Sequence, residues 1–157
     1  MSDVATSKTR RVESLIPIFN PLMKRLIGAG FPAGPNVLLT VRGRKTGLPR
    51  TFPIAILELD GRRFVQSPYG EVDWVRNLRA AGQAVVTKGH HREEVEATEL
   101  TPEIGGPILR EAVAPYLRSR LTAAFAGLFV DIRADSTAAD AVDAVRRNPM
   151  FELRQPK

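Results

Sequence analysis

The sequence contains no cysteine among its 157 residues. A disulfide framework, a thiolate metal site and a cysteine nucleophile are therefore excluded, and the composition fits a reducing compartment. Aromatic residues make up only 6%, and no RNP or helix-turn-helix pattern occurs, which argues against a nucleic-acid partner. No window approaches the roughly 20 apolar residues that a membrane span needs, and the N-terminus lacks a signal-peptide pattern. These absences predict a cytoplasmic protein.

The common catalytic motifs are also missing. The chain has no HExxH, no Walker lysine motif, no GxSxG and no GxGxxG after a strand. Its two histidines, His90 and His91, stand together in KGHHRE, a pattern typical of a solvated hairpin turn, and no further metal ligands are placed nearby. We therefore predict neither a metal site nor histidine catalysis.

What the sequence does have is positive charge. The formal net charge is +6 and the sequence pI is about 10.3, which suits nucleic acid, an acidic membrane surface or a polyanionic small molecule. The length fits one structural domain. We divide it into an N-terminal amphipathic helix and loop over residues 1–35 and a main domain over residues 36–157.

The N-terminal part reads as a helix over residues 12–27, interrupted by Pro17 and Pro21. Its basic flanks suit either a helix laid over the core or a peripheral membrane contact. Residues 28–35, GAGFPAGP, break this helix.

From residue 36 onward the pattern indicates strands. The runs NVLLTVRG, RTFPIAILEL and RRFVQS come first, and Asp60-Gly61 between the last two is typical of a type I′ hairpin. A second hairpin pair follows over residues 83–100, and MFEL near the end reads as a closing strand.

Helices are expected between and after these strands. Residues 73–81 should form a short helix with Asp73 as N-cap and Gly82 at its end. Thr101 and Pro102 begin a helix that Pro115 ends or kinks, and further helices are expected over residues 117–128 and 137–147. About six strands without βαβ alternation predict an α+β fold, an antiparallel barrel with peripheral helices.

The stretch GRKTGLPR places Arg44, Lys45 and Arg50 in one tight connection between two strands. Backbone NH groups and cations on such a turn are typical donors for a phosphate, since arginine can grip two oxygens at once. A solvated turn and a nucleic-acid contact remain alternatives.

The order of the basic turn, the Asp-Gly hairpin, FVQSPYG and DWVRNLRAAGQAVV resembles the deazaflavin-dependent nitroreductase family, actinobacterial oxidoreductases that use coenzyme F420 in a split β-barrel, the fold of FMN-binding barrels. The resemblance covers residues 36–100 and implies a small-molecule hydride acceptor: a quinone, an activated enone or a nitroaromatic. Split barrels commonly pair, so it also allows a homodimer, for which the sequence offers no interface.

The resemblance also implies the cofactor-binding residues. By this resemblance, the phosphate and acidic tail of F420 are bound by Arg44, Lys45, Thr46 and Arg50. The segments whose backbone lines the deazaflavin ring, and the helix start that favours an anion, comprise Thr51, Phe52, Pro53, Ile54, Ala55, Val65, Gln66, Ser67, Pro68, Trp74, Val75, Arg76 and Asn77. Ser67 is also the candidate for a catalytic polar contact, ahead of Tyr69 and Tyr116.

Two features depart from the family pattern. Ser67-Pro68-Tyr69-Gly70 stands where the family has Ser-Lys-Gly-Gly, which removes a cation and a glycine. The nitroreductase type uses tyrosines of its C-terminal region over the substrate, whereas the only tyrosines here are Tyr69 and Tyr116, so nitroimidazole reduction is not implied. An FMN-binding oxidoreductase of the same barrel and a non-catalytic coenzyme or lipid carrier remain alternatives.

Overall fold

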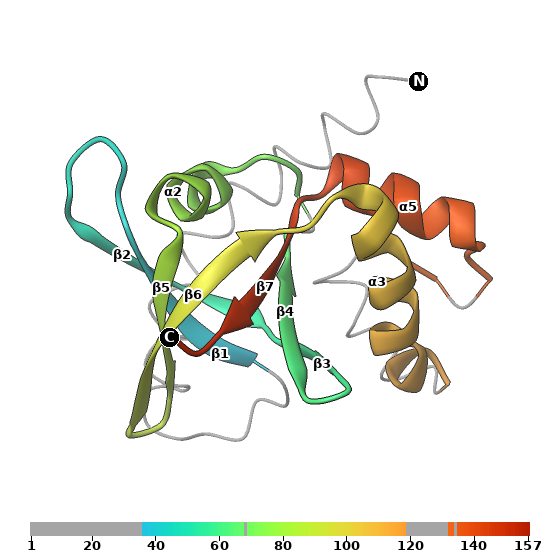
Figure 1. The fold of residues 1–157 in the computed structure, drawn as a ribbon, viewed down its shortest axis with the longest axis horizontal. Coiled ribbons are helices and arrows are strands. Elements are labelled where there is room, and N and C mark those ends of the chain that lie inside the picture. The colour runs from blue at the N-terminus through green and yellow to red at the C-terminus, as the bar shows by residue number, and fades with distance from the viewer. Residues whose placement is uncertain (1–35, 68, 119–131, 134) are drawn as a thin grey trace.

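The computed structural model describes residues 36–67, 69–118, 132–133 and 135–157 (Figure 1). The predicted helix over residues 12–27 and the break at 28–35 lie outside this range, as does most of the predicted helix over 117–128. The elements are β1 Asn36–Arg42, β2 Pro49–Ala55, β3 Leu57–Leu59, β4 Arg62–Gln66, α2 Asp73–Ala81, β5 Gln83–Lys88, β6 His91–Glu99, α3 Pro102–Leu117, α5 Ala138–Arg147 and β7 Met150–Arg154.

The seven strands form one antiparallel sheet in the order β2-β1-β5-β6-β7-β4-β3. Its two edge strands, β2 and β3, are separated in sequence by Ile56 alone, so the chain itself links the two edges and the sheet must curl. The sequence predicted one strand over residues 50–59, which is wrong. Ile56 is buried in the core at the point where the chain passes from one edge to the other, and this crossing raises the strand count from six to seven.

Alternating residues of the curled sheet supply two cores. Val65 and Phe151 face the inside of the barrel, where Val75 and Leu78 of α2 pack against them in the same cluster. Their sequence neighbours Phe64 and Met150 belong to a second cluster with α3 and α5. Figure 1 shows α2 over one end of the sheet and the α3–α5 pair beside β3 and β4. Successive residues of a strand therefore point alternately to the two faces of the sheet, and each face contributes to one of the two cores.

Several local predictions are confirmed. Asp60 and Gly61 have φ angles of 53° and 74°, as a type I′ turn requires. Gly82 ends α2 in the left-handed region, and the Thr101 side chain caps α3 by accepting a hydrogen bond from the Ile104 amide. The closing strand exists as β7, although it lies between β6 and β4 inside the sheet.

Two predicted helix limits need correction. The N-cap of α2 is Val72, not Asp73, which lies in the first turn of the helix. Valine has no polar side chain, so the helix has no side-chain cap, and the Asp73 carboxylate pairs with Arg44. Pro115 does not end α3, which runs to Leu117 with Pro107 and Pro115 inside it. Both prolines are exposed, and carbonyl groups that lose an amide partner on the solvent side can be hydrated. Thr137 caps α5, which begins one residue later than predicted.

Within the described residues, no helix is both long and apolar enough to cross a membrane.

Glu152 of β7 should make the fold sensitive to acid. Its side chain is 4% exposed and accepts hydrogen bonds from Arg62 (2.9 and 2.8 Å) and Arg154 (2.9 Å). The Arg62 bond, then the Arg154 bond, lower the pKa of Glu152 from 4.5 to about 2. Because the folded pKa is depressed, this stabilisation is present above about pH 4.5 and is lost as the pH falls through about 2.

Urea unfolding across that pH range checks this prediction. We expect the wild type to lose more unfolding free energy on acidification than Glu152→Gln, which carries no titrating group at this position. Parallel acid curves for the two proteins would contradict the assignment.

Candidate cofactor site

The basic turn between β1 and β2 is closed by its own hydrogen bonds. The Gly43 amide donates to the Leu48 carbonyl and the Gly47 amide to the Gly43 carbonyl, both at 2.8 Å. The Leu48 amide donates to Thr46 Oγ1 at 3.2 Å, and Gly47 has a φ of 72°, which glycine adopts without strain. Three of the amides that the sequence offered to a phosphate are therefore used inside the turn.

The three cations of the turn differ in their surroundings. Arg44 folds onto α2: its Nη1 donates to Asn77 Oδ1 at 2.7 Å, and its Nη2 lies 3.3 Å from Asp73 Oδ1. Lys45 and Arg50 are exposed and make no ion pair or side-chain hydrogen bond with any described residue. The cationic side chains of this turn that are available to an anion are therefore those of Lys45 and Arg50.

Helix α2 also brings the other predicted segments together. Trp74 stacks on Phe52 of β2, with ring centroids 5.2 Å apart, and lies 6.3 Å from the Phe151 ring. Phe151 pairs in register with Val65. The basic turn, β2 and the β4–β7 pair thus meet around the first half of α2.

Most apolar residues of the predicted site belong to the core. Ile54, Ala55, Val65 and Val75 are buried, so only their backbone is available to line a ring. Thr51 and Pro53 are half-buried, and Thr51 Oγ1 lies 2.8 Å from Thr40 Oγ1. Arg76 is exposed, with Nη1 3.9 Å from Asp73 Oδ1.

Ser67 anchors the loop before α2. It is fully buried, its hydroxyl donates to the Gly70 carbonyl at 2.6 Å, and its amide donates to the Pro149 carbonyl at 3.0 Å. The Gly70 amide donates to Asn148 Oδ1 at 3.0 Å, and Gly70 has a φ of 78°. Contact between Ser67 and a substrate stays a prediction; its hydroxyl hydrogen is engaged within the loop. Pro68 lies outside the described residues.

Gln66 holds the one buried side-chain polar atom without a partner among the described residues. Its Nε2 donates to the Asn148 carbonyl at 3.2 Å, whereas Oε1 has no donor. The half-buried Tyr69 has its phenol pKa raised by burial, so the phenol stays neutral at physiological pH.

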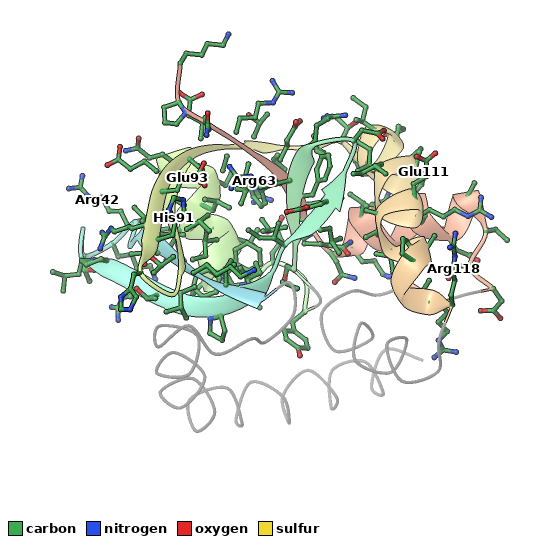
Figure 2. The ribbon with its side chains drawn as sticks, turned by 90° about the horizontal axis from the view of Figure 1, so that it is seen from below. Arg42, Arg63, His91, Glu93, Glu111 and Arg118 are labelled. Carbon is green, nitrogen blue, oxygen red and sulfur yellow. The ribbon has the colours of Figure 1, made fainter. Side chains whose placement is uncertain are left out.

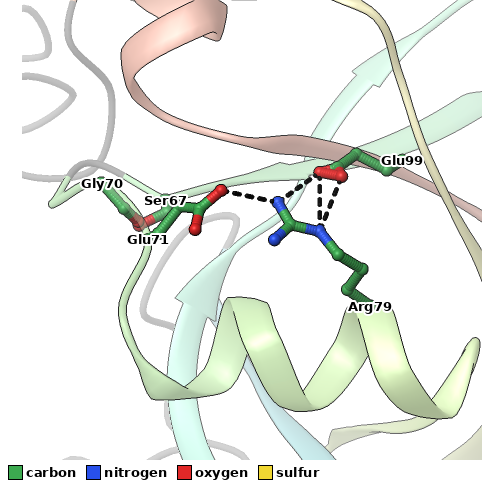
Figure 3. Close-up of polar contacts among 5 residues, drawn as sticks. All are labelled: Ser67, Gly70, Glu71, Arg79 and Glu99. Atoms are coloured by element: carbon green, nitrogen blue, oxygen red, sulfur yellow. Dashed lines mark hydrogen bonds and ion pairs between the residues drawn. The ribbon is translucent and has the colours of Figure 1, made fainter.

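Sequence reasoning missed the ion pairs that hold α2 from its other side. Arg79 donates to both carboxylate oxygens of Glu99, at 2.8 to 3.3 Å, and to Glu71 Oε1 at 3.0 Å (Figure 3). These bonds raise the pKa of Arg79, with Glu99 the larger contributor. The partners are 20 and 8 residues away in sequence, so no local pattern signals them.

An open charged groove lies elsewhere on the sheet, and none of the predicted site residues lines it. Arg63 and Glu93 form a two-bond ion pair there (2.8 and 2.9 Å) and approach each other in Figure 2. The lining residues are Gly61, Arg62, Arg63, Glu93, Glu152, Leu153, Arg154 and Gln155. Its arginines are paired with carboxylates, so the groove offers less unbalanced charge than the basic turn. Among the described residues, no group of three metal-ligating side chains is found.

A model of the F420H(2)-dependent quinone reductase family matches residues 22–116, more than half of the chain. The chain belongs to the F420H2-dependent quinone reductase family. As a member of this family it is an oxidoreductase whose cofactor is coenzyme F420. The match spans the basic turn, β2, β4 and α2, the segments that the structure gathers in one place.

Solved structures with TM-scores of 0.50 or more show the same split-barrel fold. A proposed 5-nitroimidazole antibiotic resistance protein from Bacteroides thetaiotaomicron has a TM-score of 0.53 at 11% identity, covering 85% of this chain and 80% of that one. A protein related to general stress protein 26, of the pyridoxinephosphate oxidase family, from Clostridium acetobutylicum has a TM-score of 0.50 at 10% identity, covering 87% and 83%. An F420-H2 dependent reductase, FDR-A, is 21% identical with a TM-score of 0.46, covering 76% and 94%. Curated protein sequences gave no significant match.

The residues of this quinone reductase family member fit an anionic cofactor. Two exposed cations without described ion-pair partners stand on a turn fixed by internal hydrogen bonds. A phosphate is the kind of group that such donors bind. The unpartnered Gln66 Oε1 is in addition a buried acceptor that a ligand NH could satisfy.

Proposed function

We propose that the protein reduces an electron-poor small molecule with the reduced deazaflavin as hydride donor. The candidate acceptors are quinones, activated enones and nitroaromatics, and a quinone is the first choice. The observation that carries this proposal is the exposure of Lys45 and Arg50 beside α2, within the part of the chain that matches the family model. A basic turn without a ligand would place two like charges together for no gain in stability.

In this proposal the basic turn holds the cofactor's phosphate and acidic tail, with Thr46 beside the cations. The backbone of residues 51–55 and 65–68 lines the ring, and residues 74–77 complete the site. When bound, the reduced cofactor supplies a hydride, which is one proton and two electrons. The Phe52–Trp74–Phe151 cluster keeps β2, α2 and β7 in fixed positions, and fixed positions are the protein's main contribution to such a transfer.

A quinone that accepts a hydride also needs one proton to become a hydroquinone. Ser67 already donates its hydroxyl hydrogen to the Gly70 carbonyl, and Tyr69 remains a neutral phenol because burial raises its pKa. We propose that solvent supplies this proton, with no strongly acidic side chain required.

Stopped-flow mixing of the full chain with chemically reduced F420 tests the reaction. The measured signal is the return of oxidised-F420 absorbance upon addition of a water-soluble naphthoquinone, a cyclic enone or a nitroaromatic. We expect the fastest return with the naphthoquinone and no return without protein beyond the uncatalysed background. Reduced FMN in place of F420 is the control for the flavin alternative.

Each alternative has its own outcome in this assay. Faster turnover with FMN than with F420 would favour an FMN oxidoreductase, and tight F420 binding without turnover of any acceptor would favour a carrier. The membrane contact of the N-terminal helix and a homodimer stay predictions, because the described residues do not include that helix and the structure holds one chain.

A further inference from the structure

The basic turn is attached to α2 through a single arginine. Arg44 donates four hydrogen bonds to this helix. Three go from Nη1 to Asn77 Oδ1 (2.7 Å), from the backbone amide to the same oxygen (3.2 Å) and from Nη1 to the Asp73 carbonyl (3.5 Å), and the fourth goes from Nη2 to the Asp73 carboxylate (3.3 Å). The resemblance assigns Arg44 to the phosphate together with Lys45 and Arg50, but these contacts set Arg44 apart.

Burial makes the contact with Asn77 hard to exchange for a ligand. Asn77 is 7% exposed, and its Oδ1 accepts hydrogen bonds from the amide and the Nη1 of Arg44. If the Arg44 guanidinium turned to a phosphate, this buried oxygen would lose its shorter hydrogen bond. The Arg44 side chain is itself only 24% exposed, whereas Asp73 is 82% exposed.

Asp73 also offsets the charge of Arg44. Its carboxylate lies near both Arg44 and Arg76, at 3.3 and 3.9 Å, so an approaching anion meets a partly neutralised pair there. Lys45 and Arg50 have no such counter-charge among the described residues. The unbalanced charge of the turn therefore comes from Lys45 and Arg50.

We infer that Arg44, Asn77 and Asp73 form a latch that fixes the basic turn on α2, and that Lys45 and Arg50, not Arg44, bind the anionic group of the cofactor. Arg44 and Asn77 are then positioning residues. The latch stands on the geometry alone, while the identity of the anion as the F420 phosphate rests on the proposed function.

The latch explains how two long side chains on a hairpin can bind selectively. The internal hydrogen bonds of the turn fix its shape, but its orientation relative to the barrel depends on Arg44. A turn held in place loses less conformational freedom when its cations bind, and affinity rises accordingly.

A double-mutant cycle of Arg44→Ala and Asn77→Ala separates positioning from direct binding. The two measurements are F420 affinity by fluorescence quenching and unfolding free energy in urea. We expect each single change to weaken F420 binding by roughly tenfold. The double mutant should bind F420 no less tightly than the single mutant of lower affinity, because both changes remove the same contact. The unfolding data should show the same non-additivity.

Asn77→Asp is the rescue variant. It keeps an acceptor for Arg44 and should retain the stability that Asn77→Ala loses, because an arginine–carboxylate pair replaces the arginine–amide bond. Because aspartate also restores the volume that alanine removes, the two changes are repeated in the Arg44→Ala background. There the latch predicts no advantage of aspartate over alanine, whereas a role confined to packing would keep it.

Three results overturn the inference or its premise. Wild-type affinity in Asn77→Ala with weak binding in Arg44→Ala would make Arg44 a direct ligand, and additive unfolding effects would exclude the latch. If folded wild type does not bind F420, the proposed function fails, while the unfolding cycle and the aspartate rescue still decide the latch.

Discussion

Replacing Lys45 and Arg50 together by alanine is expected to weaken F420 binding by roughly 100-fold or more. Each charge-assisted hydrogen bond contributes about 1.5–3 kcal/mol, and about 1.4 kcal/mol corresponds to a factor of ten. The unfolding free energy should stay close to wild type, because both side chains are exposed and make no ion pair or side-chain hydrogen bond with the described residues. Fluorescence-quenching titration with oxidised F420 measures the affinity.

The matched control is Lys88→Ala/Arg92→Ala, which removes one exposed lysine and one exposed arginine from the β5–β6 hairpin. The pairing of Leu38 with Thr87 and of Thr40 with Val85 places this hairpin at the opposite end of β1 from the basic turn. Equal weakening in both double mutants would indicate a general effect of net charge. Unchanged affinity in Lys45→Ala/Arg50→Ala would rule out the basic turn as the phosphate site.

Gly106→Ala should be the most destabilising small substitution in the helix pair α3–α5. A Cβ at residue 106 would lie 2.7 Å from Val142 Cγ2 and 2.8 Å from both Val142 Cα and its backbone nitrogen. Because two of these three atoms are backbone, the helices must move apart. We expect a loss of about 2–3 kcal/mol of unfolding free energy and a Tm lower by about 5–10 °C.

The neighbouring Gly105→Ala is the control for helix propensity. Its Cβ would meet only side-chain atoms, the nearest being Val145 Cγ1 at 3.0 Å, so it gains the same propensity with a smaller clash. Val142→Ala should not rescue Gly106→Ala, since the backbone atoms of residue 142 remain. Equal stability of the two alanine variants, by thermal or urea unfolding, would contradict the close packing of α3 on α5.

The features that the sequence predicted well are those decided by neighbouring residues. Asp60-Gly61 specifies its own turn through the φ angles that the two residues tolerate, and Gly82 and Thr101 act on helix ends within four residues. The antiparallel barrel followed from the count and spacing of strands. None of these predictions needs knowledge of what lies across the fold.

The features that could not be predicted from the sequence depend on partners that are distant along the chain. Arg44 and Asn77 are 33 residues apart, and Arg62 and Glu152 are 90 apart, so no periodicity links them. Arg44 and Lys45 are adjacent cations of similar chemistry, yet one faces α2 and the other solvent. The division of β2 from β3 at Ile56 likewise depends on closure of the whole sheet.

The central place of β7 in the sheet sets the order in which the protein can be completed during synthesis. Strands β2-β1-β5-β6 and β4-β3 are made first, yet only β7 joins β6 to β4. The loop that leads into α2 depends on the same late segment, through the Pro149 carbonyl and the Asn148 side chain. A ribosome-bound chain that has not yet released residues 148–154 therefore carries the basic turn and its latch but has an open sheet. The cofactor site proposed above can be completed only after translation has passed β7.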